Sequence, residues 1–222
     1  MVSRSDWSLE SLFRGQPHRV LLLTGPSLVL DLGTALAARA ALAGHRVLYL
    51  DAANAFDPYI PARLAREAGL DPHPVLDRLF ISRAFTCHQL ETLVAGRLEA
   101  AVRARRPGLV VVSGWGHLFH DENVPTREAM RLLESTVRAI RRLAEGGTPV
   151  LATHEDGPVV PRPRPLGACL ARAATAVIRV DHSEGLIRLT AAKGPADLPP
   201  LLMDAAGLQA WLRRPPRTRD GQ

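Results

Sequence analysis

Residues 24–32 read Thr24-Gly25-Pro26-Ser27-Leu28-Val29-Leu30-Asp31-Leu32, and they connect an apolar run over Arg19–Thr24 to a helical pattern over Leu32–Ala43. A strand followed closely by a helix is the repeating unit of a parallel sheet. The same alternation continues downstream, with predicted strands at Arg46–Asp51, Arg78–Ser82, Leu109–Ser113 and Thr148–Thr153. Predicted helices lie at Pro61–Ala68, His88–Arg105 and Thr126–Glu145. Because the strands carry few charges, we expect helices to cover both faces of the sheet.

The C-terminal part of the chain has a different pattern. Two strand-like runs, Thr175–Asp181 and Gly185–Ala191, are joined by His182-Ser183-Glu184-Gly185 and predict an antiparallel hairpin at the sheet edge. The predicted fold class is therefore α/β, with a mostly parallel central sheet flanked by helices and a C-terminal antiparallel hairpin. We expect a lead-in over residues 1–18, one core domain over residues 19–210, and a disordered, basic Pro/Arg-rich tail over residues 211–222.

The composition fits one globular domain. The chain has 222 residues, of which 46% are hydrophobic and 23% are charged, which excludes a collagen-like, disulfide-scaffold or disordered chain. Gly25-Pro26, Asp31 and Arg39 interrupt the longest apolar run, so no membrane-spanning helix is expected. The first residues contain no apolar core of a secretory signal, and Cys87 and Cys169 lie far apart without metal-ligand spacing. We therefore expect a cytoplasmic protein with two reduced thiols.

Positive charge is concentrated in two segments. The formal net charge is +6, and residues 213–222 contribute four arginines against Asp220. The segment Asp156–Pro165 holds Arg162 and Arg164 among four prolines, which bar regular structure. With the arginines at 103, 105 and 106, these segments could make weak, salt-sensitive contacts with nucleic-acid phosphates, or form an ordinary solvated surface. No aromatic side chains alternate with the arginines, so base stacking is not expected.

The loop at Gly25 lies where a phosphate-binding loop would lie, between a strand and a helix N-terminus. When the motif G-x-x-x-x-G-K-[ST] is aligned from Gly25, Leu30 replaces the second glycine, Asp31 the lysine and Leu32 the hydroxyl residue. Two like charges about 4 Å apart repel by roughly 4 kcal/mol at an effective dielectric near 20. The carboxylate of Asp31 is therefore expected to weaken the binding of a triphosphate. We expect Asp31 to act instead as the N-cap of a helix that begins near Leu32, with the carboxylate and the aliphatic side chains filling the site.

Six segments carry a resemblance to a known family. They are Trp7–Phe13, Val47–Pro58, Ile81–Leu93, Leu109–Gly114, Pro165–Gly167 with Ala171–Ala174, and Gly194–Pro200. In this order and spacing they resemble the RecA/RadA recombinase superfamily, specifically the ATPase core of the RadA type. The resemblance extends from about residue 7 to residue 210, and it implies a RecA-like P-loop NTPase fold.

The departures from the family pattern fall on its catalytic positions. The family uses a lysine and a Ser/Thr for ATP, a glutamate for water, an aspartate for Mg²⁺ and a glutamine that senses the nucleotide. The resemblance places at these positions Asp31, Leu32, Ala53, Ser113 and Glu155. Phosphoryl transfer depends mostly on positioning and charge neutralisation. These replacements therefore predict a pseudo-ATPase, which is not an enzyme and binds no nucleotide, cofactor or metal.

The resemblance implies an accessory or scaffold role in DNA recombination or repair, through a RecA/RadA-like protein or another repair protein, and no membrane. It matches Asp156–Pro165 to the family's second DNA-binding loop, so Arg162 and Arg164 are candidate DNA contacts. Two alternatives stay open. One is a nucleotide-binding or metal-dependent enzyme with a relocated site built from His117–Glu122 and His154–Asp156. The other is a regulatory partner subunit unrelated to DNA. The sole lysine, Lys193, is expected at the surface.

Overall fold

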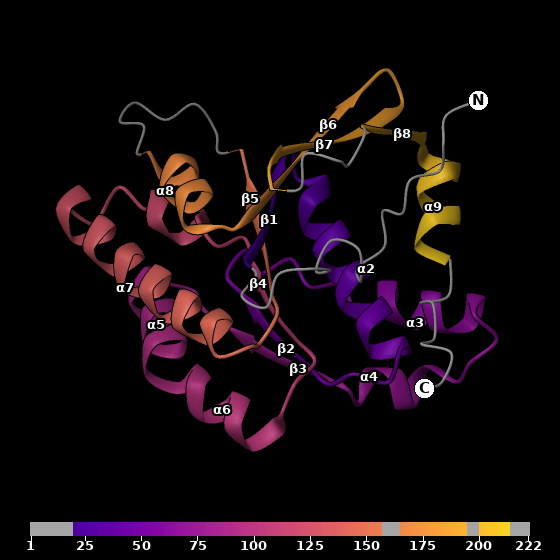
Figure 1. The fold of residues 1–222 in the computed structure, drawn as a ribbon, viewed down its shortest axis with the longest axis horizontal. Helices are drawn as coiled ribbons and strands as arrows, with labels where there is room; N and C mark the ends of the chain where they lie inside the picture. Colours follow the sequence, from indigo (N-terminus) through magenta and orange to yellow (C-terminus); the bar gives the residue numbers. More distant parts are fainter. Residues whose placement is uncertain (1–19, 157–164, 195–199, 214–222) are drawn as a thin grey trace.

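A central sheet separates two layers of helices (Figure 1). The computed structural model describes residues 20–156, 165–194 and 200–213. Its strands are β1 (Val20–Gly25), β2 (Val47–Asp51), β3 (Leu79–Arg83), β4 (Leu109–Ser113), β5 (Val150–Glu155), β6 (Ala176–Ser183), β7 (Leu186–Lys193) and β8 (Leu201–Asp204). They form a sheet in the order β3-β2-β4-β5-β1-β6-β7-β8. The strands from β3 to β6 run parallel, whereas β7 and β8 continue the sheet in antiparallel pairs.

Each face of the sheet carries its own hydrophobic core, because side chains alternate along a strand. In β1, Leu21 and Leu23 point into one core, whereas Val20 and Leu22 point into the other. The first core lies under α2 (Leu28–Leu42), α3 (Tyr59–Glu67), α4 (Pro72–Leu76) and α9 (Ala205–Arg213). The second lies under α5 (Cys87–Glu91), η1 (Thr92–Arg97), α6 (Leu98–Arg105), η2 (His117–His120), α7 (Thr126–Glu145) and α8 (Leu166–Ala173).

The structure confirms the α/β fold class with a mostly parallel sheet, flanking helices and a C-terminal antiparallel hairpin. The predicted helix over His88–Arg105 is wrong in one respect, because the π-helix η1 interrupts it. The sequence analysis also missed α4, α8, β8 and α9. Helix α9 extends to Arg213, which is three residues beyond the boundary expected for the core.

Helix α2 is buried on nearly all of its sides, between the sheet and the helices around it. Gly33 allows its close approach to β5, since a Cβ there would lie 2.7 Å from Cγ2 of Thr153. At the far end, the buried guanidinium of Arg39 donates from Nη1 to the carbonyl oxygens of Trp211 and Leu212 at 2.6 and 3.0 Å. Helices α2 and α9 are therefore joined by charge-assisted hydrogen bonds. None of the helices in the described ranges is long and apolar enough to span a membrane.

Candidate functional site

The candidate site lies at the carboxyl ends of the parallel strands, where ligand sites of α/β proteins usually form. In the register of the sheet, Gly25 of β1 lies opposite Glu155 of β5, and Asp51 of β2 lies opposite Ser113 of β4. The predicted positions Gly25, Ser113 and Glu155 therefore all lie at this edge, with Ala53 in the loop that follows β2. The positions singled out in the sequence analysis therefore lie close together in the fold.

The connection between β1 and α2 is too short to form a phosphate-binding loop. Only Pro26 and Ser27 separate the two elements, and α2 begins at Leu28. The backbone N–H of Val29 donates to the Pro26 carbonyl at 3.0 Å, and that of Leu30 donates to the Ser27 carbonyl at 2.9 Å. An anion at a helix N-terminus needs free N–H groups directed toward it. Here two of those groups already have backbone acceptors.

The expected N-cap role of Asp31 is wrong. Ser27 is the N-cap residue, and Asp31 lies inside the first turn of α2, exposed to solvent. Partial burial, and next the carboxylate of Asp57, raise the pKa of Asp31, while Arg63 lowers it. Leu30 and Leu32 are only 8% and 3% exposed and belong to the core below α2. Aliphatic side chains therefore do not fill the site. The helical backbone takes the place of the loop.

Asp51 organises the end of β2. Its carboxylate is fully buried and accepts the backbone N–H groups of Ala55 and Phe56 at 3.1 Å, while Arg83 Nε lies 3.4 Å away. These contacts hold the loop that contains Ala53. A Cβ on Gly114 would lie 2.5 Å from Cβ of Ala53, so the loops after β2 and β4 touch. This close contact places the methyl group of Ala53 between the two loops.

A buried polar pair lies on β2 and α2 beneath this edge. The hydroxyl groups of Tyr49 and Thr34 are 2.9 Å apart, and both residues are almost fully buried. Burial raises the pKa of Tyr49 to about 12, so its phenol stays protonated. Thr34 also donates to the Leu30 carbonyl at 3.2 Å. These bonds fasten the first turns of α2 to β2 and favour the helical conformation at Leu30–Leu32.

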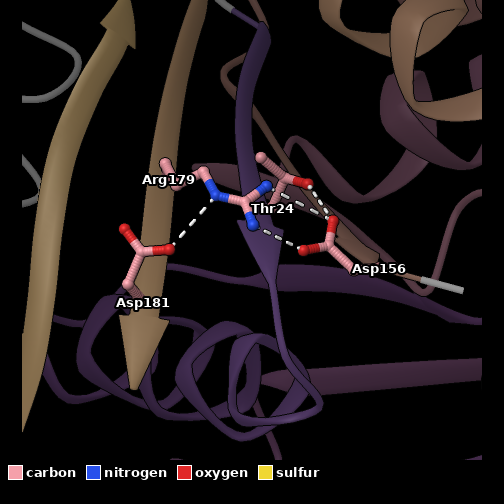
Figure 2. A network of polar contacts seen from close by, with 4 residues as sticks. All are labelled: Thr24, Asp156, Arg179 and Asp181. Atoms are coloured by element: carbon pink, nitrogen blue, oxygen red, sulfur yellow. Dashed lines mark hydrogen bonds and ion pairs between the residues drawn. The ribbon is translucent and has the colours of Figure 1, made fainter. Parts of the chain in front are cut away.

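A network around Arg179 connects three strands at the same edge (Figure 2). Arg179 of β6 donates from Nη2 to Asp156 Oδ2 at 2.8 Å and from Nε to Asp181 Oδ1 at 3.2 Å. The Thr24 hydroxyl at the end of β1 lies 3.4 Å from Asp156 Oδ1. The backbone N–H of Asp156 donates to the Gly25 carbonyl at 2.7 Å. Asp156 is thus held from two directions directly before residue 157.

The chain is fixed again after residue 164. Lys193 Nζ donates to the carbonyl oxygens of Ala171, Arg172 and Ala174, at 3.1, 3.4 and 2.5 Å. These carbonyls belong to the C-terminal end of α8, where a cation is favoured. The sole lysine is therefore a helix cap. Arg162 and Arg164 lie outside the described residues, between the Arg179 network and α8.

The residues of the alternative, relocated site do not form one cluster. His154 is buried, with its ring against Gly116 and Gly167, while His117, Asp121 and Glu122 are exposed. Burial, and next the nearby His120, lower the pKa of His154, while Asp156 raises it. Within the described ranges, no group of three or more His, Cys, Asp or Glu side chains could hold a metal ion.

Sequence reasoning did not identify the ion-pair network of Arg179 and Asp181. The sequence does contain one indication of this pair: an Arg-x-Asp pattern in a predicted strand places two opposite charges on the same face of the sheet. No signal linked Asp156 to Arg179, because the two lie on different strands, 23 residues apart. Comparisons with known proteins add no assignment: no family model matches the chain, and no curated protein shows detectable similarity to it.

Proposed function

We propose that this chain is a catalytically inactive RecA/RadA-like protein that assists DNA recombination or repair by docking on a RecA-like or other repair protein. The observation that carries the proposal is the start of α2 at Leu28, two residues after β1. A helical turn stands where a nucleotide-binding relative would need an open backbone loop. Ala53 and Ser113 supply neither a general base nor a carboxylate for Mg²⁺.

The arrangement of the sheet supports the RecA-like part of the proposal. A parallel sheet with helices on both faces is what the family resemblance implies, and the antiparallel β7 and β8 extend it at one edge. Two of the resembling segments include described strands, Val47–Asp51 forming β2 and Leu109–Ser113 forming β4, whereas Trp7–Phe13 and most of Gly194–Pro200 lie outside the described residues.

The frame around residues 157–164 supports a role in contacting DNA. Asp156 is bonded to Arg179, and Lys193 caps the helix that follows the segment. The residue before the arginine-containing segment is thus attached to the sheet, and so is the C-terminal end of the helix that follows the segment. The functional residues would be Arg162 and Arg164, which can neutralise phosphates without reading base sequence.

The nucleotide part of the proposal is tested by calorimetric titration of the full chain with ATP and Mg²⁺. We expect no saturable heat at millimolar ATP. A Kd in the micromolar range, or hydrolysis by the purified protein, would overturn the pseudo-ATPase assignment. An active RadA-type core serves as the positive control.

The DNA part is tested by fluorescence anisotropy with a single-stranded oligonucleotide at several salt concentrations. We expect weak binding, and the variant Arg162→Ala/Arg164→Ala should reduce the slope of log K against log salt by about 1.4, since single strands lose about 0.7 per phosphate contact. Arg127→Ala/Arg131→Ala, on α7, is the matched control. Unchanged binding in the first variant would remove Arg162 and Arg164 as DNA contacts.

A further inference from the structure

Helix α7 packs against α5 and η1. A groove of about 270 Å³ lies where η1, α6 and the C-terminal half of α7 meet, and it is named the α6–α7 groove. Away from the groove, two side-chain bonds join α5 to α7. His88 Nε2 lies 2.9 Å from Glu128 Oε1, and the Ser135 hydroxyl donates to Glu91 Oε1 at 2.7 Å.

The groove is open because small residues line it. Ala95 of η1, Ala139 of α7 and Gly146 face a space that larger side chains would fill. The π-helix η1 changes the direction in which this part of the helix presents its side chains, and π-helical turns occur frequently at functional sites. The floor contains Val94 and Leu143, which are only 2% and 8% exposed. An occupant would therefore bring an apolar group.

The charged residues that line the groove are Glu99, Arg103 and Arg142, with one positive charge in excess. Arg103 Nη1 is paired with Glu99 Oε1 at 2.5 Å, so its charge is largely offset. Arg142 forms no ion pair among the described residues. The surrounding elements carry more cations than anions. In total, η1, α6 and α7 contain eight arginines (97, 103, 105, 127, 131, 138, 141 and 142) and four glutamates (99, 128, 134 and 145), of which only Glu99, Arg103 and Arg142 line the groove. The occupant favoured by this charge carries carboxylates.

We propose that the α6–α7 groove docks an acidic amphipathic segment of a partner protein, with an apolar side chain on the floor and a carboxylate at Arg142. This inference rests on the proposed docking function and names the surface and the chemistry of the partner. A nucleic acid fits less well, because a phosphate backbone has no apolar group for Val94 and Leu143. Apolar anchors with complementary flanking charges are the usual mode of helix-in-groove recognition.

The test selects peptides from a random library of about 12 residues displayed on phage, using the full chain as bait. We expect enriched peptides that combine Asp or Glu with Leu, Ile or Phe. A synthetic copy of the strongest peptide should bind at least about tenfold more weakly to Arg142→Glu, measured by fluorescence anisotropy. Arg141→Glu is the matched control, because Arg141 is the exposed neighbour that does not line the groove.

A second pair of variants tests the floor without changing charge. Ala95→Phe should fill the groove and reduce peptide binding, whereas Ala100→Phe, on an exposed position of α6 outside the groove, should not. Circular dichroism verifies that each variant is folded. The proposal is overturned by peptides without acidic residues, by no enrichment, or by equal losses in both members of a pair. Preferential loss of oligonucleotide binding in Arg142→Glu would also overturn it, in favour of a nucleic-acid surface. The ATP titration remains independent, so failure here leaves the pseudo-ATPase assignment separately testable.

Discussion

Gly25 shows how tightly the carboxyl end of β1 is packed. Its φ is +152°, and a Cβ would lie 2.1 Å from the carbonyl oxygen of Val180 on β6. A backbone atom cannot move aside as a flexible side chain can. This glycine is therefore required by the sheet itself, because β6 lies too close to accept a side chain, whether or not a nucleotide binds.

Gly25→Ala should lower the free energy of unfolding by about 3 kcal/mol, from steric overlap and backbone strain together. Urea denaturation measures the change. Gly96→Ala is the control with the opposite sign, since nothing lies within 4 Å of its Cβ and alanine favours a helix by about 1 kcal/mol. Equal stability of Gly25→Ala and the parent chain would show that β6 can move away.

His154 makes stability depend on pH. Its pKa is lowered in the folded chain, first by burial and then by His120, with Asp156 acting in the opposite direction. The unfolded state, in which histidine titrates near its ordinary pKa of about 6.5, therefore binds more protons in mild acid. The contribution of neutral His154 to stability is complete at alkaline pH and is lost as the pH falls below about 6.5.

His154→Asn should flatten the decrease in stability between about pH 7.5 and pH 5. Urea denaturation at a series of pH values measures the slope. His117→Asn, which changes an exposed histidine of η2, should keep the slope of the parent chain. An unchanged slope in His154→Asn would assign the acid sensitivity to other groups.

At the scale of single elements, the start of α2 separates two explanations of the lost nucleotide site. If the charge of Asp31 were the only obstacle, Asp31→Lys/Leu32→Thr would restore ATP binding. We expect no binding in calorimetry, because the N–H groups of Val29 and Leu30 keep their helical acceptors. Asp31→Lys alone controls for the loss of the buried Leu32 side chain. A Kd below about 1 mM in the double variant, which corresponds to about 4 kcal/mol, would make charge the main cause.

Helix α8 depends on a cation from β7. Lys193→Met removes the donor to the carbonyls of Ala171 and Ala174, and we expect a loss of about 1 kcal/mol concentrated in α8. Hydrogen exchange should show faster exchange of the α8 amides, with little change in β1 or β5. Arg188→Met, an exposed change on the same strand, should leave α8 as protected as before. Uniform loss of protection over the whole sheet would contradict a local cap.

The elements also show which features a sequence can predict. The apolar runs that form β1, β2, β4 and β5 contain few charged residues, so the sequence alone predicts that helices cover both faces of these strands. The start of α2 was not visible, because a helix that is apolar on all sides has no periodic boundary. The π-helix η1 changes hydrogen bonding rather than residue type, and β8 has only four residues.

The candidate site also contains positions that the sequence can predict and contacts that it cannot. The candidate positions Asp31, Ala53 and Ser113 were predicted from a motif alignment and from the family resemblance, because they lie close to predicted strand ends. The bonds of Asp156 to Arg179 and of Lys193 to α8 join residues about 20 positions apart on different elements, at 23 and 19 for the closest contacts. Such contacts follow from the sheet register, and the register becomes known only once the strands are placed.

At the scale of the whole molecule, the last described helix, α9, is bonded to the first helix, α2. Arg39 lies in the first helix of the fold and is 6% exposed, yet its acceptors are Trp211 and Leu212 in the last helix. Its guanidinium also lies 5.6 Å from the centre of the Trp211 ring. A buried cation is tolerated only when such partners satisfy it. Arg39 therefore links the stability of α9 to the central part of the sheet.

Arg39→Met keeps an unbranched apolar side chain but removes the charge-assisted bonds, so we expect a loss of about 2 kcal/mol in the free energy of unfolding. The α9 amides should lose hydrogen-exchange protection down to the level of local opening. Arg66→Met, an exposed change on α3, should alter neither quantity. If α9 stayed protected in Arg39→Met, apolar packing of Leu208 and Leu212 against the core would suffice to hold it. If protection fell across α2 and β1 as well, the two ends of the fold would unfold as one cooperative unit, and α9 would be part of the core rather than an attachment to it.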